Sequence, residues 1–111
     1  MKRLLVLCIL MTFVVLSLSA QEGDWLWANK AGGTLDDYGQ SIAVDSEGNS
    51  YVTGYFMGTA TFGSITLTSS GSNDIFIAKI DNNGNWLWAN RAGGTSSEIG
   101  YGIAVDSEGN T

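Results

Sequence analysis

The sequence predicts an all-β protein made of repeated antiparallel sheets, and three observations carry that prediction. Residues 25–49 return at residues 86–110 without a gap, with eighteen of the 25 positions identical, so the chain has an internal period of 61 residues. Between the two copies lie short runs of alternating side chains that are rich in β-branched and aromatic residues, as strands are. After residue 20, no sustained 3.6-residue periodicity indicates a helix.

The expected strands follow one another along the repeat, and each is a short run with strand-like alternation. They cover residues 25–29, 41–45, 50–56, 74–80, 86–90 and 103–106, and residues 59–68 add a short hairpin. The fifth and sixth of these strands repeat the first and second. Both faces of the strands carry apolar groups, with Phe76 and Ile80 on one face and Ile75 and Ile77 on the other. A sheet that is apolar on both faces must be covered on both.

Turns of one kind connect these strands. The pattern D-x-x-G-N occurs at residues 45–49, 81–85 and 106–110. Its Asp can accept hydrogen bonds from the backbone that follows, and its Gly can adopt the positive φ that such a turn requires. In an EF-hand calcium loop Gly stands at the sixth position, whereas here it stands at the fourth. We therefore expect structural turns and no metal site.

A four-stranded sheet with both faces covered, repeated every 61 residues, is typical of a β-propeller blade. The chain is expected to hold one complete blade, over about residues 40–91, with flanking strands of the neighbouring blades on either side. Propellers close with about four to eight blades, so residues 21–111 are predicted to be a fragment of a larger propeller, with a truncated second copy. An elongated structural β-solenoid is the alternative architecture.

The first 20 residues differ from the rest and predict a cleaved signal peptide. Lys2 and Arg3 precede an apolar run at residues 4–16, and small residues lead to Ala20, after which cleavage is expected. The apolar run is shorter than the roughly 20 residues of a membrane span, so no span is expected after cleavage. The chain's single Cys, Cys8, lies in this segment. These features predict bacterial export and a secreted or cell-surface location.

Composition excludes several kinds of function. All eleven acidic residues follow residue 20, where only Lys30, Lys79 and Arg91 are basic, so nucleic acid is not an expected partner. The sequence has no His, which is the commonest general base and metal ligand. We expect no catalytic residue, cofactor or bound metal in this segment. The alternative is a secreted hydrolase or lyase whose catalytic residues lie outside it.

Four segments resemble a known repeat family. The segments WLWANKAGG, SIAVDSEGNSYVTGYF, GTATFG and NDIFIAKID are similar in order and spacing to the SBBP-type β-propeller repeat of secreted bacterial proteins. That resemblance implies a multi-bladed propeller in an exported protein, often beside adhesion-like modules. Because the family's molecular function is mostly unassigned, the resemblance implies fold and compartment more than chemistry.

The two copies differ mainly in one segment. Six of their seven mismatches fall within residues 35–41. In a propeller this connection should share a face with the loop at residues 57–73, while the D-x-x-G-N turns lie on the opposite face. Function tends to lie on such varied loops over a rigid scaffold. The predicted binding residues are Asp36, Asp37, Tyr38 and Glu98, with a protein or carbohydrate ligand.

The tryptophans recur at strand spacing in each copy, as Trp25 and Trp27 and again as Trp86 and Trp88. A buried indole contributes on the order of 5 kcal/mol by its apolar area, so we expect these side chains to fill the core between blades rather than to stack on sugars. The sequence thus predicts an exported, non-catalytic scaffold or binding module, in the context of surface adhesion or recognition.

Overall fold

The computed structural model describes residues 23–111, and the predicted signal peptide lies outside the described residues. Every regular element of the described part is a strand, which confirms the all-β prediction. The strands are β1 (Ala31–Gly33), β2 (Asp37–Val44), β3 (Ser50–Phe56), β4 (Thr59–Phe62), β5 (Ile65–Thr68), β6 (Asp74–Ile80) and β7 (Trp86–Ala92). Residues 23–111 thus hold no helix of the length and apolar content that a membrane crossing requires.

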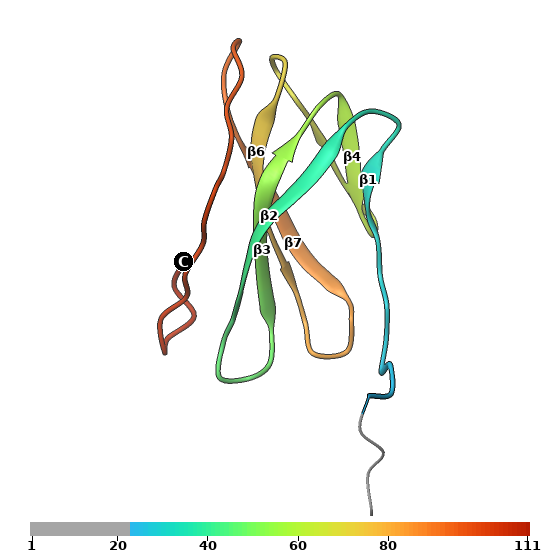
Figure 1. Cartoon of the computed structure of the whole chain (residues 1–111), viewed down its shortest axis with the longest axis vertical. Coiled ribbons are helices and arrows are strands. Elements are labelled where there is room, and N and C mark those ends of the chain that lie inside the picture. Colours follow the sequence, from blue (N-terminus) through green and yellow to red (C-terminus); the bar gives the residue numbers. More distant parts are fainter. Residues whose placement is uncertain (1–22) are drawn as a thin grey trace, which may run out of the picture.

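The larger sheet has the order β2-β3-β6-β7, with every neighbouring pair antiparallel (Figure 1). It spans residues 37–92, slightly more than the predicted blade. Side chains in register across it include Val52, Ala78 and Ala89. Gly54 allows β2 to approach β3, because a Cβ at this position would lie 1.8 Å from the carbonyl oxygen of Tyr38. The predicted four-stranded blade is confirmed.

The predicted hairpin at residues 59–68 is also confirmed, as β4 and β5. It pairs with β1 to form a second sheet of order β1-β4-β5, which covers one face of the blade (Figure 1). Phe62 of β4 joins the two layers, since its ring centroid lies 5.1 Å from that of Phe76 and 5.2 Å from that of Trp86. Phe56, Ala60, Ala78 and Ala89 complete the buried part of this core.

The opposite face of the blade is covered by the C-terminal segment, residues 93–111, which runs along the sheet (Figure 1). A Cβ at Gly100 would lie 2.7 Å from the Thr53 hydroxyl, and one at Gly109 would lie 3.4 Å from the Tyr51 hydroxyl. Tyr51 and Thr53 are accordingly buried. Both faces of the blade are therefore partly covered, while Ile42 and Val44 of β2 stay exposed.

Two predicted strands are wrong. Residues 25–29 and 103–106 are extended but form no strand. Their counterparts in the other copy do: residues 86–90 lie in β7, where β6 pairs with them, and residues 42–44 lie in β2, where β3 pairs with them. The segments therefore differ in their partners rather than in their own sequence, because a strand requires a neighbour that accepts its backbone hydrogen bonds.

All three D-x-x-G-N turns have the predicted geometry. In each, one Asp Oδ1 accepts hydrogen bonds of 2.9 Å from the backbone N–H groups two and four residues later. Gly48, Gly84 and Gly109 have φ of 83°, 85° and 82°. Backbone and Asn donors thus occupy the carboxylates of Asp45, Asp81 and Asp106 and lower the pKa of each.

Candidate functional site

The varied segments and the loop at residues 57–73 meet at one end of the blade strands, as predicted. The backbone N–H of Met57 donates to the Asp36 carbonyl at 3.0 Å. On the following copy, the N–H of Glu98 donates to the Asn73 carbonyl at 2.8 Å. Each varied segment is therefore tied to one end of the β3–β6 connection, and the D-x-x-G-N turns lie at the other end of the strands (Figure 1).

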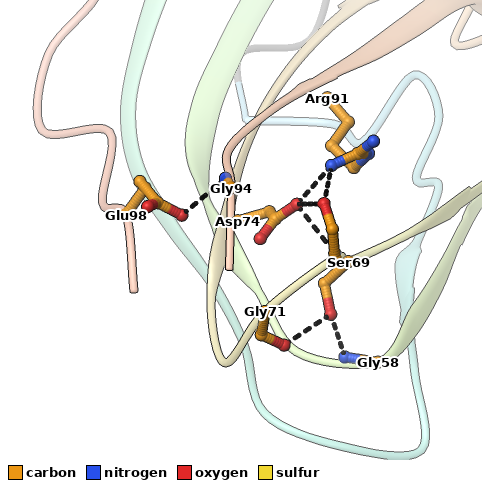
Figure 2. Close-up of polar contacts among 8 residues, drawn as sticks. Gly58, Ser69, Gly71, Asp74, Arg91, Gly94 and Glu98 are labelled. Carbon is orange, nitrogen blue, oxygen red and sulfur yellow. Dashed lines mark hydrogen bonds and ion pairs between the residues drawn. The ribbon is translucent and has the colours of Figure 1, made fainter. Parts of the chain in front are cut away.

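Asp37 and Glu98 occupy the same position in the two copies and make the same contact. The Gly33 N–H donates to Asp37 Oδ2 at 2.8 Å, and the Gly94 N–H donates to Glu98 Oε2 at 3.1 Å (Figure 2). Each acidic side chain thereby closes the connection between two blades. The replacement of Asp by Glu preserves this hydrogen bond, so these two predicted binding residues have a structural contact as well.

Three of the four predicted binding residues line one groove. Asp36, Asp37 and Tyr38 border an open groove of about 650 Å³, which β1 and Thr61 also line. Its lining also carries Asn29, Lys30 and Leu35. The structure does not bring Glu98 to this groove, because residues 96–100 lie across the opposite face of the blade.

Tyr38 is held by another tyrosine. Its ring stacks on that of Tyr55 with centroids 4.8 Å apart and planes 23° apart. About half of Tyr38 (46%) nevertheless stays exposed. The stack fixes the start of β2 at the edge of the groove and leaves an aromatic surface at this loop face.

The same end of the blade carries a buried charged cluster that was not predicted from the sequence. Asp74, at the start of β6, is fully buried and forms an ion pair of 2.6 Å with Arg91 of β7 (Figure 2). Ser70 donates to Asp74 Oδ2 from its N–H at 3.0 Å and from its hydroxyl at 3.2 Å. Burial raises the pKa of Asp74, but the hydrogen bonds from Ser70 and Arg91 outweigh it and leave this pKa below its usual value.

This cluster orders the loop that precedes β6. Ser69, next to Ser70, accepts a hydrogen bond from the Gly58 N–H at 3.0 Å and donates to the Gly71 carbonyl at 3.4 Å (Figure 2). One signal for the cluster was present in the sequence. Asp74 lies two residues before Phe76 in the same strand, so both side chains are on the buried face. A buried carboxylate requires a partner.

Among residues 23–111, no three His, Cys, Asp or Glu side chains gather in a group that could hold a metal ion. Asp37 accepts a hydrogen bond from the Gly33 N–H. Its neighbour Asp36 lines the groove with a carboxylate, which can accept hydrogen bonds from a ligand. Its geometry suits the binding of polar groups.

Comparison with known proteins agrees with this architecture. Residues 26–55 match the family model described as "Beta-propeller repeat" (SBBP). The chain carries a β-propeller repeat. The SBBP match runs from the segment before β1 almost to the end of β3, and it favours a propeller over the alternative solenoid. A propeller repeat of this kind suggests a scaffold or binding module.

A relative supports the same fold. The chain is 31% identical over 103 residues to an uncharacterized WD repeat-containing protein of Acanthamoeba polyphaga mimivirus. The alignment covers 77% of this chain and 7% of the viral protein. The chain thus spans a small part of the length of the relative it matches.

Proposed function

We propose that this chain is part of an exported, non-catalytic β-propeller that binds a protein or carbohydrate ligand in surface adhesion or recognition. The observation that carries the proposal is the contrast between the two ends of the blade. One end holds turns that share the pattern D-x-x-G-N, and the other holds the segment at residues 35–41, where six of the seven differences between the copies fall.

The chemistry of the groove supports binding rather than catalysis. Asp36 presents a carboxylate, and the exposed residues of β1 present backbone groups. Such acceptors match the hydroxyl groups of sugars and the amides of peptides. The sequence contains no His that could serve as a general base beside a nucleophile.

Exchanging the varied segment between copies tests the binding proposal. Residues 35–41 (LDDYGQS) are replaced by their counterpart SSEIGYG, and the protein is applied to arrays of defined oligosaccharides and peptides. We expect the parent protein to bind a defined subset and the exchanged variant to lose it. Glu47→Gln, on the opposite end of the blade, is the control and should retain binding. Equal binding by all three proteins would place recognition elsewhere.

Export is tested separately, in a bacterial host. The order of charged, apolar and small residues in the first 20 positions predicts that protein from the periplasm or medium begins at Gln21. N-terminal sequencing reads this directly. Recovery of a cytoplasmic form that retains Met1, with none outside, would contradict export and leave the binding proposal standing.

A further inference from the structure

The groove beside β1 has a counterpart in the second copy, and there the chain itself fills it. The repeat alignment pairs residues 30–37 with residues 91–98. In the second copy, residues 70–74 of the loop before β6 bind this segment through hydrogen bonds and an ion pair. In the first copy, residues 30–33 and 35–37 line the open groove of about 650 Å³. The filled position therefore indicates what fits the open one.

Backbone groups make part of this contact. The Ser72 N–H donates to the Ser96 carbonyl at 3.2 Å, and the Glu98 N–H donates to the Asn73 carbonyl at 2.8 Å. Gly71 permits the close approach, because a Cβ at this position would lie 2.3 Å from the Ser96 carbonyl oxygen. Backbone donors and acceptors are the same whatever the side chain, so the first copy offers the same hydrogen bonds.

Two side-chain contacts add specificity. Arg91 forms its ion pair with Asp74 at 2.6 Å, as Figure 2 shows. The Asn73 amide donates to the Ser97 hydroxyl at 3.0 Å. Together, these contacts select a loop in which an amide side chain is followed directly by a carboxylate.

The first copy retains a partner for each of these groups. Lys30 stands at the position of Arg91 and supplies a cation, which forms no ion pair within residues 23–111. Asp36 stands at the position of Ser97 and supplies an acceptor, and a carboxylate accepts an amide hydrogen bond more strongly than a hydroxyl does. Both residues line the groove.

We propose that the groove of the first copy binds the residue 70–74 loop of another repeat unit, with the Asp of that loop on Lys30 and its Asn on Asp36. The contact repeats an interface that the chain already forms between its own two copies, so its partner is a unit of the same kind. This inference rests on the proposed function and deepens it, because it names a protein loop as the ligand of the same groove.

The test is an NMR titration of the protein with the peptide Ser-Ser-Gly-Ser-Asn-Asp-Ile, residues 69–75, acetylated and amidated at its ends. The Asp37 amide should shift, because it takes the place of the Glu98 N–H. The free peptide loses conformational freedom on binding, so we expect a Kd on the order of 1 mM. The Gly71→Ala peptide should not bind, because its Cβ would meet the Leu35 carbonyl. No shift at Asp37, or equal binding of both peptides, would overturn the proposal.

A charge exchange tests the ion pair. Lys30→Glu should weaken binding about tenfold, and the Asp74→Lys peptide should restore binding to this variant. Lys79→Glu makes the same change near the opposite end of the blade and should leave the Kd unchanged. Thermal melts show whether the variants fold; if Lys30→Glu does not, the Asp74→Lys peptide should bind the parent protein about tenfold more weakly. Equal weakening by Lys30→Glu and Lys79→Glu would overturn the proposed ion pair.

The groove's ligand class is decided separately from the groove's role in binding. Array ligands that require residues 35–41, with no shift at Asp37 on adding the peptide, would leave the proposed function standing and overturn the loop as its ligand. Binding of the peptide together with its loss in the Gly71→Ala peptide supports the loop, whether or not any oligosaccharide binds.

Discussion

At the scale of single residues, the Asp74–Arg91 pair is the clearest source of stability that depends on two side chains. Arg91→Ala leaves the buried Asp74 without its cation, so we expect a loss of about 2–3 kcal/mol in the free energy of unfolding. The estimate is at the low end because 36% of the Arg91 side chain is exposed to solvent. Arg91→Lys, which introduces the residue found at position 30 of the first copy, should cost less. Urea unfolding measures both, and equal losses would show that the charge contributes nothing.

The same carboxylate predicts how stability varies with pH. The pKa of Asp74 in the folded state lies below its unfolded value of about 3.9, so its contribution is complete above that pH and is lost as pH falls through the folded pKa. Asp45, Asp81 and Asp106 have lowered pKa values as well and act in the same direction. The free energy of unfolding should therefore fall below about pH 4. Asp74→Asn should show a smaller fall between pH 7 and pH 3, and an unchanged pH profile would contradict this assignment.

At the scale of elements, the two copies provide a matched pair of tryptophans. Trp86 packs edge-on against Phe62 and donates its indole N–H to the Lys30 carbonyl at 3.1 Å, whereas its counterpart Trp25 is 90% exposed. Trp86→Ala should cost about 3 kcal/mol and Trp25→Ala less than about 0.5 kcal/mol. Denaturant unfolding compares the two substitutions. Similar losses would mean that residues 25–29 are packed in solution.

The same comparison shows how far sequence predicts these elements. Alternation and turn chemistry predicted the blade strands and the β4–β5 hairpin, because both signals are local. They could not separate residues 86–90 from residues 25–29, which have the same sequence, WLWAN, and differ in whether a partner strand is present.

Part of the site escaped prediction for a related reason. Asp36, Asp37 and Tyr38 were found because the two copies differ there, but the comparison of copies could not show that Glu98 lies away from their groove. The Asp74–Arg91 pair joins residues 17 positions apart and depends on the register of β6 against β7, in which Phe76 lies opposite Arg91. Such long-range pairing appears only once the sheet is assembled.

At the scale of the whole molecule, each blade relies on its neighbours. The β1-β4-β5 sheet includes β1, from the segment that leads into the blade, and the C-terminal segment, from the second copy, covers the opposite face. Ile42 and Val44 of β2 remain 62% and 60% exposed on the side where a further layer would pack. In repeat proteins of this kind, stability grows with the number of interfaces between units.

This dependence predicts the effect of adding one more copy. In the repeat alignment Thr111 corresponds to Ser50, so a second copy of residues 51–92 can be joined after it. Residues 103–105 then meet a new copy of β3, the partner that makes residues 42–44 a strand. We expect their backbone amides to become protected in hydrogen exchange and the free energy of unfolding to rise by several kcal/mol. The control carries residues 51–92 in scrambled order and should leave these amides unprotected. If the added copy folds while residues 103–105 still exchange freely, their lack of a partner is not what keeps them from forming a strand.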